Sequence, residues 1–433
     1  MTAPNNPSAR TLRVGALTRV EGEGALKVEL RDGVPEVVEL NIYEPPRFFE
    51  AFLQGRAYTE PPDITARICG ICPVAYQTSA CNAIEDACGV TLPDELVALR
   101  RLLYCGEWIH SHTLHMYMLH APDFLGAPDV ITVARDHREA VERGLALKKA
   151  GNRLQEAVGG RAIHPVNVRV GGFYSVPTRA DLQPMAEELR RALDHALATV
   201  EWVSDFDFPD LTVDHEFLAL TGDRYALEGG TITRSGGPAF GIAEFSDHVR
   251  ETHVAHSTAL HATLDGRPHL TGPMARYSLN HDRLSPLAKE AASAAGLGDE
   301  CRNPFRSIVV RAVETVYAVE EALRIIDNYE RPARPSVEVE PRAGVGHGWS
   351  EAPRGLLYHR YEIDDAGLIK AALIVPPTSQ NQAAIEADLT QVLVAGIDLD
   401  DAALTTMCER AIRNYDPCIS CATHFLTLNI DRR

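Results

Sequence analysis

Two Cys-x-x-Cys pairs are the part of this sequence best suited to chemistry. Cys69 and Cys72 lie in the N-terminal part of the chain, and Cys418 and Cys421 lie close to its C-terminus. A two-residue spacer lets both thiolates of a pair face one ion, and two such pairs usually form a four-thiolate site. The spacing alone favours structural zinc over an iron–sulfur centre. However, zinc ribbons close local loops, whereas these pairs would join distant parts of the chain, and thiolates also suit nickel and iron.

The other cysteines carry no further cluster motif. They are scattered among apolar residues, so we expect buried small side chains at Cys81, Cys88, Cys105, Cys301 and Cys408. The total of nine cysteines is odd, and residues 1–10 lack the apolar core of a secretory signal. We therefore expect no disulfide framework, and reduced thiols in the cytoplasm fit the sequence better.

Composition argues against two classes of partner. Lys plus Arg number 42 against 60 Asp plus Glu, which gives a formal net charge of -18 and argues against nucleic acid as the main partner. No stretch approaches about 18 uninterrupted apolar residues, so no membrane span is predicted. With 433 residues, 45% of them hydrophobic, the chain is long enough to bury a sizeable core.

Several short motifs together carry a family resemblance. The cysteine pairs stand in Arg-x-Cys-Gly-x-Cys and Asp-Pro-Cys-x-x-Cys-x-x-His, and the other motifs are Arg19-Val20-Glu21-Gly22, Arg47-Phe48-Phe49-Glu50, Glu351-Ala352-Pro353-Arg354-Gly355 and Val375-Pro376-Pro377-Thr378. In this order and over nearly the whole chain, they resemble the large, catalytic subunit of nickel–iron hydrogenases. The residues of these motifs are most similar to those of the shorter cytoplasmic members, which couple hydrogen to NAD(P) or to the deazaflavin F420.

The resemblance implies specific roles for the four cysteines. All four would hold nickel, and Cys72 and Cys421 would also bridge to an iron that carries carbon monoxide and cyanide ligands. The metal pair would supply the Lewis acid for heterolytic cleavage of hydrogen while a nearby base takes the proton. Cys418 is the candidate first base and Glu21 the candidate relay beside it. For Glu21, the alternative is a solvated charge at the end of a strand.

Three more charged residues are expected around this centre. Arg354 would hang over the metals and donate hydrogen bonds to a diatomic ligand, although a surface ion pair is its alternative. Asp123 resembles an acidic partner near that arginine. Asp416 would cap the turn before Cys418 and would also lie near Arg354.

Two positions depart from the family pattern. Tyr76 stands where many members have a histidine, and its ordinary pKa of about 10 makes it a poor proton relay. Pro377 stands where many members have a hydroxyl residue that binds an iron-bound cyanide, so another group nearby would have to hold that ligand. We expect Pro376 and Thr378, on either side, to contact the cofactor.

The resemblance also implies a second metal site, usually occupied by magnesium. Glu50 and His424 match its ligands, and the backbone carbonyl near Leu373 would complete the protein ligands. This site would orient the turn that carries the second cysteine pair. Four histidines on one predicted helix suggest a metal site by their number, but the resemblance implies that this helix packs beside the active centre, where His115 would hydrogen-bond: His110, His112, His115 and His120.

Partners follow from the same resemblance. They are an iron–sulfur small subunit, diaphorase-type flavin and iron–sulfur subunits, nickel-insertion chaperones and a maturation protease. Iron–sulfur clusters and flavin would lie on the partner subunits only. Family precursors carry a tail after the terminal histidine that a protease removes, so residues 425–433 are expected to be a maturation extension.

Three other functions stay open at this point. The homologous quinone-binding subunit of respiratory complexes has lost the cysteine pairs, which this chain keeps. A hydrogen sensor would share the metal site and differ in turnover. A zinc-stapled structural protein would contain zinc and no nickel.

The elements that must position these side chains are visible in the sequence pattern. Alternating residues predict strands between residues 11 and 43, and residues 356–363 and 368–375 indicate a hairpin. Apolar residues at three- and four-residue spacing predict helices over 94–119, 133–157, 182–203 and 308–328. With no repeat or clear linker, we expect one interlocked, helix-rich α+β domain over residues 1–433, with a central helical bundle and small peripheral β-sheets.

Overall fold

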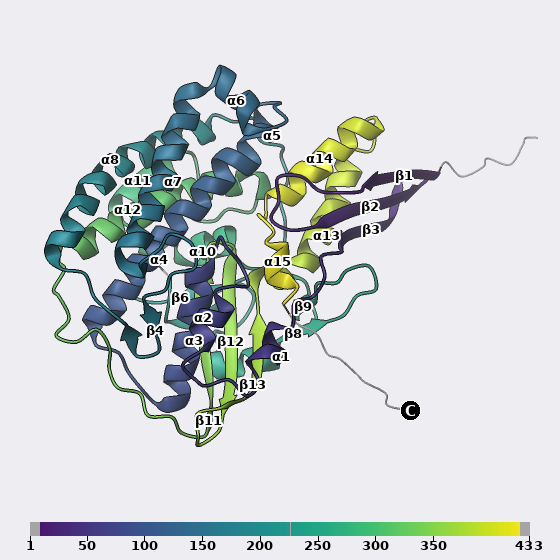
Figure 1. The fold of residues 1–433 in the computed structure, drawn as a ribbon. Coiled ribbons are helices and arrows are strands. Elements are labelled where there is room, and N and C mark those ends of the chain that lie inside the picture. The colour runs from purple at the N-terminus through teal and green to yellow at the C-terminus, as the bar shows by residue number, and fades with distance from the viewer. Residues whose placement is uncertain (1–8, 226, 425–433) are drawn as a thin grey trace, which may run out of the picture.

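A bundle of four long helices forms one side of the molecule. The computed structural model describes residues 9–225 and 227–424. Helices α4 (Asp94–Leu114), α7 (Arg138–Gly159), α8 (Arg179–Ser204) and α12 (Ser307–Asp327) pack against one another (Figure 1). α4 and α12 are buried over most of their length, whereas α7 and α8 keep an exposed polar face. The bundle is thus the hydrophobic centre against which the site elements are built.

A three-stranded antiparallel sheet lies beside the bundle and carries helix α3 (Pro73–Cys88) on one face. Its strands are β11 (Gly344–Ala352), β12 (Gly355–Ile363) and β13 (Ile369–Val375), in that order. The helix crosses β11 at backbone contact, because a Cβ added to Gly346 or Gly348 would lie 1.9 or 2.0 Å from a carbonyl oxygen of α3. The glycines of β11 therefore set the position of α3, whose start carries the first cysteine pair.

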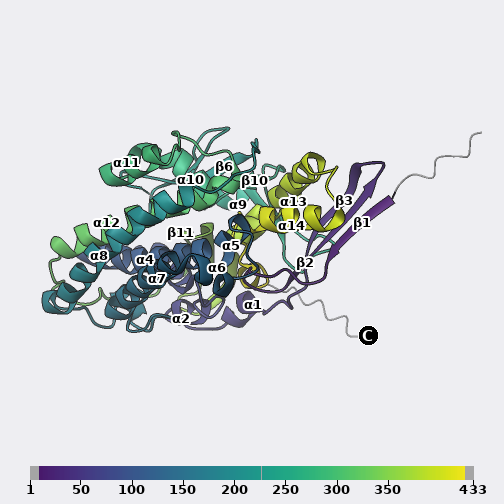
Figure 2. The same cartoon turned by 90° about the horizontal axis from the view of Figure 1, so that it is seen from above.

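The N-terminal strands form a separate antiparallel sheet at the opposite end from the bundle. β1 (Ala9–Val14), β2 (Gly24–Arg31) and β3 (Val34–Ile42) project from the body, and Figure 2 shows them at the far end of the molecule. Alternate residues of β2 are buried, as a sheet with one packed face requires. Helices α13 (Pro377–Ala395) and α14 (Asp401–Arg413) pack against this sheet, so the two ends of the described chain lie side by side.

Shorter elements connect these units. They are α1 (Phe49–Leu53), α2 (Pro61–Thr65), a π-helical turn (His115–His120), α5 (Ala121–Phe124), α6 (Val130–Asp136), β4 (Val168–Arg169), β5 (Gly172–Phe173), β6 (Glu216–Thr221), β7 (Thr231–Arg234), α9 (Phe245–His248), β8 (Val249–Thr252), β9 (His261–Leu264), β10 (His269–Leu270), α10 (Pro273–Asn280), α11 (Pro286–Ala294), α15 (Ile419–Ala422) and 3-10 turns at Ile242–Glu244, His281–Arg283 and Pro304–Arg306. Two-stranded pairs β4–β5 and β8–β9 and the sheet β10–β6–β7 complete the β structure.

The predicted helix-rich α+β class is confirmed, and two helix predictions need correction. The helix expected over 94–119 ends at Leu114 and continues as the π-helical turn, which leads directly to Pro122, a residue that cannot donate to a preceding carbonyl. The helix expected over 133–157 is divided at His137, whose backbone leaves the helical region (φ -129, ψ 47). Strand β11 and helices α13 and α14 were not predicted.

Two further predictions concern the limits of the chain. Residues 425–433, expected to be a maturation extension, lie outside the described residues. Every helix within residues 9–225 and 227–424 is too short or too polar to cross a bilayer.

Candidate metal centre

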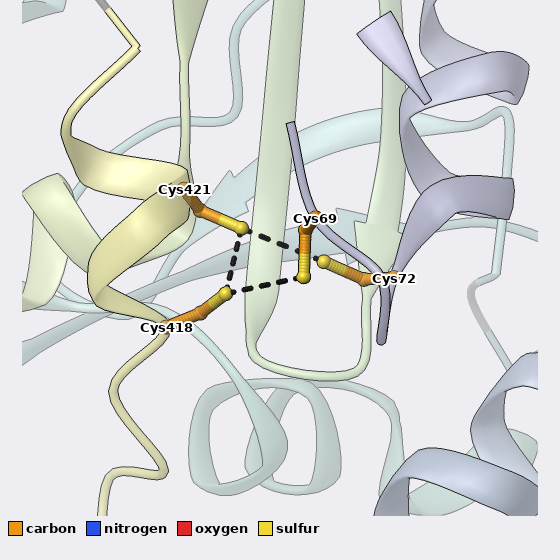
Figure 3. A group of neighbouring side chains, drawn as sticks. All are labelled: Cys69, Cys72, Cys418 and Cys421. Carbon is orange, nitrogen blue, oxygen red and sulfur yellow. Dashed lines mark hydrogen bonds between the residues drawn. The ribbon is translucent and has the colours of Figure 1, made fainter. Parts of the chain in front are cut away.

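Two turns from distant parts of the chain carry the four cysteines. Cys69 lies in the turn before α3, and Cys72 is the residue directly before that helix begins. Cys418 directly precedes α15, and Cys421 lies within it. Pro73 suits the first position of α3 because no N–H is needed there. All four thiols are buried and point toward one another, as Figure 3 shows.

The sulfur atoms are close enough to share metal ions. The Sγ of Cys418 is 2.8 Å from that of Cys421 and 3.4 Å from that of Cys69, and the Sγ atoms of Cys72 and Cys421 are 3.6 Å apart. Soft metals bind such thiolates at about 2.3 Å. Burial raises the pKa of Cys418 and Cys421, so the set needs a cation before all four thiols ionise.

Backbone hydrogen bonds join the second cysteine turn to the N-terminal part of the chain. The Ile419 N–H donates to the Glu21 carbonyl over 3.0 Å, and the N–H groups of Arg47 and Phe49 donate to the carbonyls of Thr423 and His424, each over 2.8 Å. These backbone hydrogen bonds therefore hold residues 419–424 between two N-terminal segments, one at Glu21 and one at Arg47–Phe49. This arrangement brings the two cysteine pairs together.

Glu21 lies directly against Cys418. Its Oε2 is 3.1 Å from the Cys418 Sγ and accepts a 3.0 Å hydrogen bond from the Ser420 N–H. Burial raises the pKa of the Glu21 carboxyl above its ordinary value. The predicted position beside Cys418 is thus found, and a solvated charge at the end of a strand does not describe this side chain.

Arg354 reaches the cysteines from the tight turn between β11 and β12. Its Nε donates to the Asp416 carbonyl over 2.8 Å, and its Nη2 donates to Asp416 Oδ1 over 3.1 Å. Burial lowers the pKa of this guanidinium, but Asp416 and the cysteines outweigh it and raise the pKa well above its ordinary value. Its Nη1 is buried with no hydrogen-bond partner among the described residues. Arg354 is therefore a fixed cation with one donor group left over beside the thiols.

The cap of the second cysteine turn differs from the one predicted. The Cys418 N–H donates to Thr378 Oγ1 over 3.0 Å, so Thr378, in the first turn of α13, holds this amide. The Asp416 carboxylate is turned to Arg354 instead, and Asp416 itself adopts a left-handed backbone (φ 49). The Pro376 carbonyl, just before α13, accepts a 3.0 Å hydrogen bond from the Ser379 hydroxyl. Contact of Pro376 and Thr378 with a cofactor stays a prediction.

Asp123 has other partners than the predicted one. Its Oδ1 forms ion pairs with Arg19 over 2.5 Å and with Arg413 over 2.8 Å, and its Oδ2 is 3.2 Å from His120 Nδ1. Burial raises the pKa of this carboxyl, but His120 and the arginines outweigh it and hold the pKa at about 2. The expected pairing with Arg354 is corrected, because the chain after α4 places Asp123 between the N-terminal segment and the end of α14.

The candidate magnesium site is assembled on the outer edge of β13. Glu50 Oε1 accepts a 2.7 Å hydrogen bond from the Ile374 N–H, and His424 Nε2 lies 2.8 Å from the Ile374 carbonyl and 3.7 Å from Glu50 Oε1. The carbonyl is thus that of Ile374, not Leu373. Along an edge strand, backbone groups point alternately toward the neighbouring strand and away from it. Leu373 is paired with Arg360 of β12, so the next residue presents the outward carbonyl.

Two carboxylates near the site, Glu107 buried and Glu251 half-buried, had no signal in the sequence. Glu251, on β8, accepts a 2.6 Å hydrogen bond from Ser379, and burial raises its pKa to about 7. Glu107, on α4, accepts hydrogen bonds from the Val74 and Ala75 N–H groups over 2.6 and 3.1 Å. It thereby caps the helix that follows Cys72. Both are isolated acidic residues in the sequence, and their roles become visible only from the partners that the fold brings beside them.

The histidines of the α4 region contact protein groups. His115 Nε2 lies 2.7 Å from the Arg413 carbonyl, His112 Nε2 lies 3.0 Å from Glu314, and His120 Nε2 lies 2.9 Å from Asn414. Burial lowers the pKa of His110 to about 3, so this side chain is neutral. These contacts are with Arg413, Glu314 and Asn414, so the packing of the histidines beside the centre stays a prediction.

The residues present fit a nickel–iron centre. Four buried thiols supply soft donors for two metals. A single tetrahedral zinc would need only these thiolates and would give the hydrogen-bond donors beside them, on Arg354 and Tyr76, no function. The spare Arg354 Nη1 is buried with no hydrogen-bond partner among the described residues, and the buried Tyr76 hydroxyl faces Cys421. Such donors suit the diatomic ligands of an iron.

Comparison with known proteins defines the class. The family model described as nickel-dependent hydrogenase matches residues 47–144 and 256–424. The alpha subunit of sulfhydrogenase 1 from Pyrococcus furiosus is 34% identical over 425 residues, covering 96% of this chain and 98% of the relative. A vhu-type F420-non-reducing hydrogenase chain from Methanococcus voltae is 30% identical, covering 88% and 97%. The chain belongs to the nickel-dependent hydrogenase family.

A solved structure supports a more particular statement. The chain is similar, with a TM-score of 0.86 and 27% identity, to a crystal structure of an NAD+-reducing [NiFe]-hydrogenase in the H2-reduced state, covering 97% of this chain and all of that one. This chain is the catalytic large subunit of a [NiFe] hydrogenase, and its four-cysteine cluster lies at the expected nickel–iron site. A zinc-stapled structural protein and a quinone-binding subunit without the cysteine pairs are thereby excluded.

Proposed function

We propose that this chain cleaves hydrogen reversibly into protons and electrons and passes the electrons to an iron–sulfur small subunit, then on to a soluble carrier such as NAD(P). The observation that carries the proposal is the Glu21 carboxylate 3.1 Å from Cys418 Sγ inside a buried four-cysteine cluster. Metal ligands and a proton acceptor thus lie in contact, which is the arrangement that heterolytic cleavage requires.

The four cysteines would hold the metals. Cys69, Cys72, Cys418 and Cys421 would bind nickel, and Cys72 and Cys421 would also bind an iron with carbon monoxide and cyanide ligands. When bound, this group supplies the Lewis acid that polarises hydrogen and accepts its electrons. Arg354 would donate from its spare Nη1 to a diatomic ligand, and its charge would stabilise the anionic cluster.

The proton would leave through the protein's own groups. Cys418 Sγ takes the proton first, and Glu21 Oε2 receives it over the 3.1 Å contact. The Ser420 N–H holds that carboxylate oxygen in place, so little reorganisation is needed at transfer. Asp416 would act by positioning, since it fixes the Arg354 guanidinium, and Asp123 would act by fixing the segment that carries Glu21.

A magnesium ion would complete the C-terminal end. Glu50 and the Ile374 carbonyl offer oxygen ligands, and His424 lies beside both. An oxygen-rich site completed by water suits this cation. The ion would fix the end of the turn that carries Cys418 and Cys421.

Partners are proposed from the relatives. Several relatives are subunits of multi-subunit hydrogenases, which supports a small-subunit partner. The structural neighbour reduces NAD+, so we favour a diaphorase module and NAD(P). Nickel-insertion chaperones and a protease that removes residues 425–433 would act during maturation. Intact mass of the active enzyme tests the last point, because a full-length chain would contradict it.

The decisive experiment removes one thiol. Cys418→Ser should abolish hydrogen–deuterium exchange and nickel retention, because this residue is both ligand and first proton acceptor. Cys408→Ser, at a buried cysteine on α14, is the matched control and should keep both. A Cys418→Ser enzyme that exchanges hydrogen at the wild-type rate would refute the proposal. Hydrogen-dependent reduction of NAD+ or NADP+ by the co-purified complex tests the acceptor separately.

A further inference from the structure

A second group of metal-ligating side chains lies outside the cysteine centre and the Glu50–His424 site. His256 belongs to the segment between β8 and β9, His261 is the first residue of β9, and Glu386 is on α13. The ligand atoms of these three side chains all lie within 4.8 Å of one another. His256 and His261, which are close in the sequence, thus meet Glu386 from the distant helix α13.

The geometry of this group is close to that of a coordination sphere. His256 Nε2 is 2.7 Å from Glu386 Oε1, and His261 Nδ1 is 3.9 Å from Glu386 Oε2. Ligand atoms bound to one zinc ion lie about 3 to 3.5 Å apart, given bonds of about 2.0 to 2.2 Å. Small rotations of the two imidazoles would thus place all three around one ion.

The 3.9 Å separation does not fit a purely structural hydrogen-bond group. It is too long for a hydrogen bond, so the carboxylate does not satisfy the His261 Nδ1. The other ring nitrogen, His261 Nε2, is buried with no hydrogen-bond partner among the described residues. An ion between Glu386 and His261 would bind Nδ1, the ring nitrogen that faces the carboxylate.

The surroundings hold the ligands in place and leave a way in. The Leu40 N–H donates to Glu386 Oε1 over 2.9 Å, which orients the carboxylate as outer contacts of metal sites commonly do. The two imidazoles meet edge to face at 5.5 Å between ring centroids. The His261 side chain is 7% exposed, whereas that of His256 is 20% exposed, so an ion and a water ligand reach the group from the His256 side.

We propose that His256, His261 and Glu386 bind a divalent first-row transition metal, zinc in preference, completed by water. Two imidazoles and one carboxylate are donors typical of zinc and disfavour calcium and magnesium. The site has no cysteine, so it is chemically distinct from the nickel–iron centre.

The position of the site gives it a structural role. The segment that carries His256 is tied to the end of β3, because the Thr258 N–H donates to the Ile42 carbonyl over 2.8 Å. Ala259 and Ile42 pack with Ile419 and Ala422 of the second cysteine turn in one small apolar cluster. A metal at this point clamps the segment before β9, and with it this apolar cluster, to α13.

Metal analysis of the purified wild-type enzyme, dialysed against zinc and then against buffer, tests the proposal. We expect about one zinc per chain in addition to nickel and iron. His256→Gln and Glu386→Gln should each lose this zinc while nickel content and hydrogen–deuterium exchange stay unchanged. His248→Gln is the matched control, because His248 pairs with Asp265 and lies outside the group. Loss of zinc from the control as well would overturn the assignment.

Cobalt substitution gives an independent measurement. Cobalt(II) bound to two imidazoles and a carboxylate in a low-coordinate site absorbs visible light, and the band should be present in the wild type and absent in His256→Gln. Because His256 is the most exposed of the three, this variant is the one expected to fold normally. A wild-type enzyme that retains no extra metal and shows no cobalt band holds only an imidazole–carboxylate pair, and the proposal is then wrong.

Discussion

At the residue scale, the contact between Glu21 and Cys418 combines a metal ligand with a proton acceptor. The Ser420 N–H fixes the carboxylate oxygen that faces the thiol, and the Glu21 backbone carbonyl holds the Ile419 N–H. One residue thus positions the cysteine turn with its backbone and serves the proton with its side chain. A substitution that changes only the side-chain chemistry separates these two roles.

Glu21→Gln is expected to slow catalysis without loss of the metals. Glutamine keeps the size of the side chain and an oxygen for the Ser420 N–H, but it has no site for a transferred proton at neutral pH. We predict a fall in hydrogen–deuterium exchange by about 100-fold or more, the usual contribution of a general base. Nickel and iron contents should match the wild type. Glu23→Gln, at an exposed neighbour, is the control, and a wild-type rate in Glu21→Gln would refute the relay.

Asp123→Asn should destabilise the enzyme in a pH-dependent way. The folded-state pKa of about 2 lies below the unfolded value, so the charged form stabilises the fold above about pH 4, and this stabilisation is lost as the pH falls through about 2. We expect the free energy of unfolding at pH 7 to drop by about 2 kcal/mol. Unfolding curves from pH 7 downwards should show the gap to the wild type closing below about pH 4. An equal gap at all pH values, or the same effect in exposed Asp194→Asn, would contradict the ion-pair assignment.

The residue types of the site could be predicted, whereas some pairings could not. The cysteines, Glu21 and Arg354 stand in motifs that tie each residue to its chemistry. The arginine that pairs with Asp123 could not be predicted, because the path of the backbone decides which of several arginines lies beside it. The carbonyl of Ile374 in place of Leu373 depends on which backbone groups of an edge strand point outward, a parity that no side chain reveals.

At the element scale, the first cysteine pair is positioned by the contact between α3 and β11. Gly346 and Gly348 leave the space that the α3 backbone occupies, and Glu107 caps the start of the helix. The same glycines hid β11 from prediction, because glycine is uncommon in strands and three alternate glycines leave one face of its first half without side chains. The π-helical turn was equally hidden, since its residues continue the helical pattern of α4.

Gly348→Ala is expected to disturb this contact. The added Cβ would lie 2.0 Å from the Ser79 carbonyl, so α3 and β11 must separate. We predict a loss of at least about 2 kcal/mol in the free energy of unfolding, as for overpacked cores, together with reduced nickel content because the first cysteine pair moves with α3. Thermal unfolding and metal analysis measure both effects. Gly298→Ala is the control, because a Cβ added at Gly298 lies more than 4 Å from every other side chain or distant backbone atom, and it should leave stability and nickel content unchanged. A Gly348→Ala enzyme with wild-type stability and nickel content would show that α3 is not held at backbone contact.

At the scale of the whole molecule, the active centre lies where two distant parts of the chain, each carrying one cysteine pair, meet and close the fold; we call this contact the closure. The first cysteine pair belongs to the body formed by α3 and its sheet, whereas the second follows α14, which packs against the N-terminal strands. The sequence predicted this closure through its two cysteine pairs and through the family resemblance. It could not predict the backbone hydrogen bonds that complete the closure, because these bonds do not depend on residue type.

Loading of the metals should therefore tighten this closure and little else. In the nickel-free chain, backbone hydrogen bonds, the side chains of Glu21, Arg354 and Thr378 and the packing of α15 hold residues 416–424, whereas bound metals would add direct links between both cysteine pairs. We predict that amide hydrogens of residues 416–424 and of the Arg47–Phe49 segment exchange at least about 10-fold faster in the nickel-free chain. The amides of α12, which lies in the bundle and contributes no cysteine to the centre, should exchange at the same rate in both forms. Hydrogen-exchange mass spectrometry on the two forms makes the comparison, and equal rates at residues 416–424 would mean that protein contacts alone hold the closure.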